Sequence, residues 1–252
     1  MAERDEIIAF CDELLEIGTF DDYGPNGLQV PGAAEVSVVA TGVSANLATL
    51  AGAADAGAQL ILTHHGLFWE FLPRPLSAQM AARLRLLLER GISLAGYHLP
   101  LDAHPAAGNN ALLCRAVGFE PAEPFGEARG RAIGFAGRSD SGVAAEALVA
   151  RVTETLGREP LVQGDGPDLV RSVGVVTGAG AGTIHEAARR GLDALVTGEP
   201  AEHAMADARE GGLHFIAAGH YATETLGIRR LGELVAERFR LRHEFIDVPN
   251  PV

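Results

Sequence analysis

The sequence predicts an α/β protein of two similar α/β domains that arose by internal duplication, with mainly parallel sheets flanked by helices. Segments with apolar residues at helical spacing alternate with short apolar runs, and several runs are continuous, as in strands buried on both faces. In addition, residues 37–65 and 172–200 share one plan: a strand ending in Thr-Gly, a helix, a glycine, and a strand ending in threonine. The segments that follow correspond as well and align His98 with His220.

Each predicted element has a local reason. Helices are expected where apolar residues recur at helical spacing and a glycine often follows, and Ser77 provides an N-cap for one of them. In chain order they cover 4–18, 46–57, 77–91, 105–118, 141–157, 183–191, 201–212 and 223–239. Strands are expected where short apolar runs are bounded by turn residues. They cover 35–42, 58–65, 92–98, 131–137, 172–178, 193–199, 213–220 and 243–248.

A joint between the two halves is expected at 119–130, a segment rich in proline, glycine and charge. The first half is expected to cover 1–123, completed by the C-terminal segment 205–252, and the second half to cover 124–204. A chain of 252 residues is long enough for two domains of this size.

Composition excludes several classes of partner. The net charge of −13, with arginine as the only fixed cation, argues against nonspecific binding to nucleic acid or to an anionic membrane. No apolar run approaches the ~18 residues of a membrane span, and the first ten residues are acidic where a signal peptide would be basic, so we expect a cytoplasmic protein. Cys11 and Cys114 lie in predicted helices and are expected to be core residues.

Histidines and carboxylates collect at the ends of the predicted strands. The carboxyl ends of parallel strands meet at one edge of an open α/β sheet, where ligands bind, so these groups are expected to gather there. Three imidazoles and two carboxylates exceed the three protein ligands of a typical catalytic zinc, and suit two divalent metal ions that share a bridging carboxylate. Such ligands fit zinc, iron, manganese, cobalt or nickel equally. The five candidate ligands are His64, His65, His220, Asp102 and Glu224, and His98 ends another of these strands beside them.

Each of these residues alone also has a structural explanation. His98 could be a hydrogen-bonded core histidine, and Thr223 and Glu224 could serve as the cap and first-turn carboxylate of a helix. The joint pattern favours metal, because every group follows a strand of the same direction. His203, four residues after Glu199, could face the same cleft. The other histidines fit loop, helix-face or strand-surface positions, and are His104, His185, His214 and His243.

The motifs "NGLQV", "THHGLFW", "HLPLD" followed by "GNNALL", "TGEPAEH" and "GHYATE" resemble the dinuclear metal-centre hexameric protein family, often described as GTP cyclohydrolase 1 type 2 and related to the yeast NGG-one-interacting factor. The resemblance covers nearly the whole chain, in order. It implies two similar α/β domains and a toroidal homohexamer built as a trimer of dimers. It also implies two metal ions per subunit. Matched by motif, His64, His220 and Glu224 would hold one ion, and His65, Asp102 and the bridging Glu224 the other.

Two positions depart from the family's usual pattern. Ser44 and Asn110 stand where the family usually or often has aspartate. Neither maps onto a metal ligand, so the departures concern substrate contacts and leave the expected metal site intact.

The function expected from the resemblance is hydrolysis of a nucleotide-like or phosphorylated small molecule, of the GTP cyclohydrolase type, by a metal-bridging hydroxide. His98, outside the ligand set, is the candidate general acid or base; its alternative role is to orient Asp102 or a bound water. The alternative function is a non-catalytic, metal-binding regulatory or binding hexamer.

Two further segments have open interpretations. Glycines 178, 180 and 182 give GxGxG, where a dinucleotide fingerprint needs GxGxxG, so this loop is either a phosphate-binding helix N-terminus or a flexible turn. The aromatic segment 68–73 could line the cleft and stack a base, or pack in a subunit interface.

Overall fold

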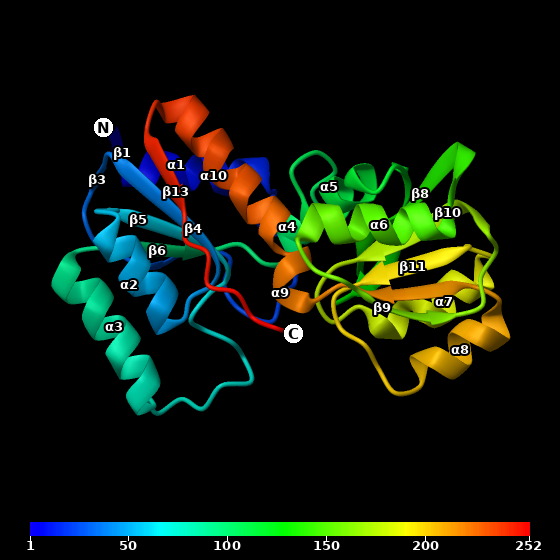
Figure 1. Ribbon diagram of the computed structural model, residues 1–252. Helices are drawn as coiled ribbons and strands as arrows, with labels where there is room; N and C mark the ends of the chain where they lie inside the picture. The colour runs from blue at the N-terminus through cyan, green and yellow to red at the C-terminus, as the bar shows by residue number, and fades with distance from the viewer. The chain divides into compact units, whose positions relative to one another are not determined.

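The computed structural model describes residues 1–252 and shows an α/β chain with two mixed sheets flanked by helices (Figure 1). The chain divides into two compact units. The first unit contains Met1–Leu101 and Ile228–Val248, and the second contains Asp102–Gly227 and Pro249–Val252. None of the helices combines the length and the apolar composition needed to cross a bilayer.

The first unit is built on a five-stranded sheet with the order β13-β4-β5-β6-β2. Four neighbouring strands are parallel, and β2 pairs antiparallel with β6 at one edge. The strands are β13 Arg242–Phe245, β4 Val38–Ser44, β5 Leu60–His65, β6 Ser93–Gly96 and β2 Gly27–Val30. A small antiparallel pair joins β1 Ala2–Glu3 to β3 Glu35–Val36.

Helices cover this sheet because its strands are apolar on both faces. Leu50 of α2 and Leu87 of α3 pack with Ile61 of β5 in one buried cluster, whereas Leu60 and Leu62 are buried on the opposite side of that strand. The helical segments that begin in this unit are α1 Arg4–Leu14, η1 Ile17–Thr19, α2 Leu47–Asp55, α3 Ala78–Arg90 and α4 Leu99–Ala103.

Local signals place α3 as expected. Ser77 caps this helix, because its hydroxyl oxygen accepts a hydrogen bond from the backbone N–H of Met80 at 3.1 Å. The helix ends at Gly91, whose φ of 63° is the left-handed conformation that favours glycine.

The second unit is built on a six-stranded mixed sheet with the order β7-β8-β10-β11-β12-β9. Only β10, β11 and β12 are mutually parallel. The strands are β7 Glu120–Ala128, β8 Arg131–Ala144, β9 Leu161–Gly164, β10 Leu169–Val176, β11 Ala194–Thr197 and β12 His214–Ala217. The helical segments are α5 Asn109–Ala116, α6 Ala145–Leu156, η2 Ala181–Thr183, α7 Ile184–Arg189, α8 Ala204–Gly211, α9 His220–Thr223 and α10 Thr225–Phe239, which continues into the first unit.

Both units contain the same central arrangement, which agrees with the repeat in the sequence. In each, three consecutive parallel strands lie side by side, and an antiparallel strand pairs with the third: β4-β5-β6-β2 in the first unit and β10-β11-β12-β9 in the second. Origin by duplication stays an interpretation of this likeness.

Three expectations need revision. Both sheets are mixed: the first is mainly parallel with one antiparallel edge strand, but in the second only β10, β11 and β12 are parallel, and β7, β8 and β9 pair antiparallel. The expected joint at 119–130 is largely strand β7, which forms a hairpin with β8 through a turn at Arg129 and Gly130, both with positive φ. Its prolines are compatible with a strand because β7 lies at the sheet edge. The units also differ from the expected halves, since residues 102–123 and 205–227 belong to the second unit.

Cys11 and Cys114 are buried free thiols, as expected. Burial raises the pKa of each to about 12, so both are inert core residues.

Candidate metal centre

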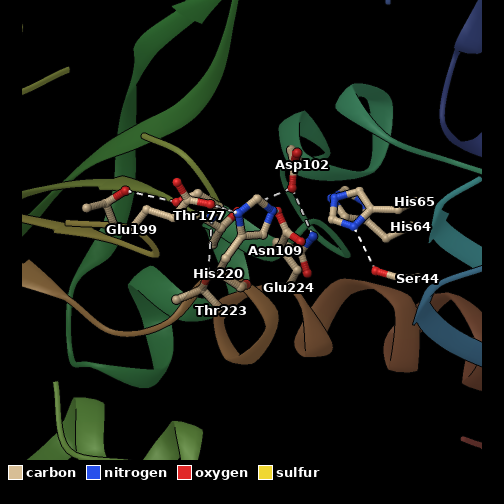
Figure 2. A network of polar contacts seen from close by, with 12 residues as sticks. Ser44, His64, His65, Asp102, Asn109, Thr177, Glu199, His220, Thr223 and Glu224 are labelled. Carbon is tan, nitrogen blue, oxygen red and sulfur yellow. Dashed lines mark hydrogen bonds and ion pairs between the residues drawn. The ribbon is translucent and has the colours of Figure 1, made fainter. Parts of the chain in front are cut away.

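His64 and His65 are the last two residues of β5, and each has a defined partner. His64 is fully buried, and its Nδ1 lies 3.0 Å from the carbonyl oxygen of Tyr97. A carbonyl oxygen only accepts, so this Nδ1 carries the proton and donates it. His65 Nδ1 lies 3.1 Å from the hydroxyl of Ser44, the residue opposite it on β4 (Figure 2). The two imidazole centroids are 4.7 Å apart, so neighbouring residues at the strand end do present their rings together.

His98 joins this pair. It follows β6, and its ring centroid lies 5.1 Å from that of His64 and 5.6 Å from that of His65. One nitrogen from each of the three rings lies within 4.8 Å of the others, so the group could hold a metal ion. The predicted convergence of strand-end histidines is therefore present within the first unit.

Asp22 is a functional candidate that sequence reasoning missed. Its carboxylate is 2% exposed and lies 2.7 Å from His98 Nδ1. It also accepts hydrogen bonds from the backbone N–H groups of Tyr23 and Leu99 and from the amide of Asn26. Burial raises the pKa of Asp22, but the hydrogen bond and charge of His98, with the bonds from Asn26 and Leu99, lower it overall. Asp22 therefore fixes the orientation of the His98 ring.

The aromatic segment after β5 borders this cluster. The Trp69 ring lies 5.1 Å from His98 and 5.9 Å from His65, measured between centroids. Phe71 stacks on Trp69 at 5.8 Å and 16°, and its side chain is 70% exposed. Trp69 therefore lies beside two of the histidines of the first unit.

Asp102 lies in the second unit and is held in a buried network (Figure 2). Its Oδ1 accepts from the Asn109 amide at 2.9 Å and from the Thr177 hydroxyl at 3.2 Å. Asn110 is fully buried; its amide donates to the backbone carbonyls of Asp102 and Ile133, and its side-chain oxygen accepts from Thr177 N. Asn110, one of the two positions that depart from the family pattern, thus helps to hold the backbone around Asp102 in place.

His220 is the first residue of α9, Glu224 is the residue between α9 and α10, and the two form a close pair. His220 Nε2 is 3.1 Å from Glu224 Oε1, and its Nδ1 is 2.6 Å from Glu199 Oε1 (Figure 2). Glu224 is 3% exposed. Burial lowers the pKa of His220, but the hydrogen bonds and charges of Glu224 and Glu199 outweigh it and raise the pKa to about 9. This pocket of negative charge suits a cation.

The Thr177-Gly178 dipeptide after β10 connects these two groups. Thr177 contacts Asp102, and the backbone N–H of Gly178 donates to the Thr223 hydroxyl at 3.2 Å. Gly178 has a φ of 65°, and a Cβ on it would collide with Glu224 Oε1. Gly180 likewise packs directly against Val176. Close packing therefore accounts for Gly178 and Gly180, whereas Gly182 has open space around it.

The remaining histidines occupy other places. His203 pairs with Asp207 and stacks on His185. His243 is half-buried and lies 2.7 Å from the Thr41 hydroxyl, so it belongs to the interior of the first unit rather than to a strand surface. His104 accepts hydrogen bonds from the loop that follows it, and His214 contacts the carbonyl of Pro167.

Comparison with known proteins adds independent information. The family model Duf34/NIF3 (NGG1p interacting factor 3) matches residues 2–251. A protein of Escherichia coli strain K12 called GTP cyclohydrolase 1 type 2 homolog is 42% identical over 253 residues, covering 98% of each chain. A protein of the same name from Deinococcus radiodurans is 39% identical over 98% of this chain and 93% of its own.

Two solved structures share the whole fold. The structural-genomics structure described as protein ybgI, unknown function, superposes with a TM-score of 0.90 at 41% identity, and covers 100% of both chains. The crystal structure of TTHA1606 from Thermus thermophilus superposes with a TM-score of 0.89 at 34% identity, again over 100% of both chains.

Proposed function

This chain belongs to the Duf34/NIF3 family, and from that premise we propose that it is a dinuclear metal-dependent hydrolase of a nucleotide-like or phosphorylated small molecule, with GTP cyclohydrolase-type chemistry. Two divalent ions per subunit would be held by five ligands, with Glu224 as the bridge. The ligands would be His64, His65, Asp102, His220 and Glu224.

The orientation of the imidazoles is the observation that supports this proposal most strongly. A metal-binding histidine usually engages its second ring nitrogen with a carbonyl, a carboxylate or another polar group, which fixes the tautomer and aims the first nitrogen. His64 does so through Tyr97 O, His65 through Ser44 and His220 through Glu199, each by Nδ1. Each ring would therefore coordinate through Nε2.

The carboxylates are prepared in the same way. Asp102 Oδ1 is oriented by Asn109 and Thr177, and Glu224 is placed at a buried helix junction. Two divalent ions bring four positive charges, and Asp102 and Glu224 return two. The loaded site would be positive within an acidic chain of net charge −13, and so would attract an anionic substrate such as a nucleotide.

The chemistry that such ions supply is Lewis-acid activation of water near neutral pH. His98 would move the proton, since Asp22 holds its Nδ1 and leaves Nε2 as the exchanging atom. Trp69, beside His98, would stack on the base of the substrate. In a cyclohydrolase reaction, one water adds to C8 of the purine and opens the imidazole ring by cleavage of one C8–N bond, and a second water hydrolyses the resulting formamide to release formate.

The proposal includes a homohexamer arranged as a trimer of dimers. Light scattering should then give about six times the 26.3 kDa chain mass. A monodisperse monomer or dimer would contradict the closed ring.

Glu224→Gln tests the metal centre. The amide keeps the size of the side chain but removes the charge that holds two cations together, so at least one ion should be lost in elemental analysis, with unchanged circular dichroism. Glu233→Gln, on the adjoining helix α10 and paired with Arg230, is the matched control and should retain both ions. If folded Glu224→Gln keeps two ions at wild-type affinity, Glu224 is not the bridge.

Turnover tests the chemistry. Formate release from GTP, lost on chelation and restored by added metal, would support the hydrolase. Two bound ions with no turnover of GTP or of simple phosphoesters would favour the non-catalytic binding or regulatory role instead.

A further inference from the structure

A second group of side chains that could bind a metal ion lies on the surface of the second unit, and it includes none of the five proposed ligands of the dinuclear centre. It consists of His185 on α7 and of His203 and Asp207 on the α8 side. We propose that these three residues form a separate site for one divalent first-row transition-metal ion, such as Zn²⁺.

The local fold brings the three donors together. His203 precedes the first residue of α8, and Asp207 follows four residues later, so one helical turn places both on one face. His203 Nδ1 lies 2.7 Å from Asp207 Oδ2, and His185 Nε2 lies 3.8 Å from the same oxygen. The two imidazoles are nearly parallel, at 13° with centroids 5.8 Å apart.

The distances suit a single ion after small rotamer changes. Two ligands bound to one zinc ion at ~2.0–2.2 Å lie roughly 3.0–3.5 Å from each other. All three donor atoms lie within 4.8 Å of one another, so shifts of about 1.5 Å or less would suffice. The His185 side chain is 65% exposed and that of His203 is 48% exposed, so both imidazoles have room to change rotamer.

The donor types decide the class of metal. Two imidazoles and one carboxylate favour zinc, copper, nickel or cobalt over calcium and magnesium, which prefer sites made of oxygen ligands. Three protein ligands leave positions for water or for a group of another molecule. A bound ion would also cross-link α7 and α8, and so stabilise this part of the second unit.

The test is Zn²⁺ binding by the full, chelator-treated chain, measured by equilibrium dialysis and elemental analysis. His185→Gln and Asp207→Asn should each bind one equivalent fewer than wild type, or bind it at least tenfold more weakly. Glu210→Gln removes an exposed charge from the same helix and should match wild type. Circular dichroism checks that all variants are folded.

Two outcomes would overturn the site. One is an unchanged number and affinity of Zn²⁺ ions in both His185→Gln and Asp207→Asn. The other is an equal loss in Glu210→Gln, which would show a nonspecific charge effect. The result is independent of the proposed dinuclear centre, because Glu224→Gln leaves these three residues intact and His185→Gln leaves the five proposed ligands intact.

Discussion

Asp22→Asn is the substitution for which the structure specifies a cost. The carboxylate accepts four hydrogen bonds, two on each oxygen: Oδ1 from Tyr23 N and His98 Nδ1, and Oδ2 from Asn26 Nδ2 and Leu99 N. An asparagine has one oxygen, so its NH₂ group must face one of these donor pairs. Either orientation leaves a backbone N–H, of Tyr23 or of Leu99, without its acceptor.

The magnitude follows from those bonds. A hydrogen bond to a charged group contributes about 1.5–3 kcal/mol, and a buried donor left unsatisfied costs about 1–3 kcal/mol. If one bond of the facing pair is rescued by a change of the His98 tautomer, one charged hydrogen bond is lost and one buried donor is left unsatisfied, so the variant should lose roughly 2.5–6 kcal/mol of unfolding free energy. Asp55→Asn, an exposed carboxylate at the end of α2, should stay within about 0.5 kcal/mol of wild type.

The assay is urea unfolding of chelator-treated protein near neutral pH and again in acid. The pKa of folded Asp22 lies below its ordinary value of 3.8, so the folded chain binds fewer protons than the unfolded chain. Its contribution is complete above that ordinary value and is lost as the pH falls through the lowered folded pKa. Since a protonated aspartate resembles asparagine, the two proteins should converge in acid. A difference below about 0.5 kcal/mol near neutral pH would refute the role given to Asp22.

Three further outcomes are expected. Gly178→Ala should lose metal in elemental analysis, because the added Cβ would displace Glu224. The control Gly57→Ala, also at positive φ but in open space, should keep its metal and lose only about 1–2 kcal/mol of stability. Equal metal content in the two variants would contradict this expectation. Burial lowers the pKa of His243, so wild-type stability should decline as the pH falls below 6.5, and His243→Gln should flatten that part of the stability–pH curve; parallel curves would count against it. His98→Ala should keep both ions, and its hydrolytic rate should fall by roughly 10²–10⁴-fold. Unchanged turnover would show that His98 serves only in packing.

The elements that the sequence predicted well are those with strong local signals. The helix after Ser77, the apolar run that ends at His64 and His65, and the long C-terminal helix all occur close to their expected places. Strands β2 and β9 were not expected, because four-residue edge strands carry little periodic signal. Strand β7 was expected to be a linker because its prolines and charges are typical of loops, although a sheet edge also tolerates them.

In the candidate site, too, the sequence predicted the residues with a clear local signal and missed those that depend on the tertiary fold. Strand-end position identified His64, His65 and His98, since a parallel sheet brings such residues together whatever their spacing in the chain. Asp22 lies 76 residues before His98, in a turn whose sequence shows only ordinary turn chemistry. Its pairing depends on how the loop before β2 folds back on the sheet, and no local pattern encodes that. The unit to which Asp102 belongs was missed because the boundary falls inside a short helix, α4.

The three predicted imidazole ligands differ in how they respond to mutation. His64 is oriented by a main-chain carbonyl, that of Tyr97, so no substitution at position 97 removes the acceptor. His65 and His220 are oriented by side chains, Ser44 and Glu199, which a single codon change can replace. The hydrogen-bond acceptor of His64 therefore stays the same whatever residue occupies position 97. The basicity of His65 and of His220, in contrast, can change through substitution of the side chain that orients each ring. A carboxylate in place of the Ser44 hydroxyl would raise the basicity of His65, whereas no side-chain substitution offers the same change to His64.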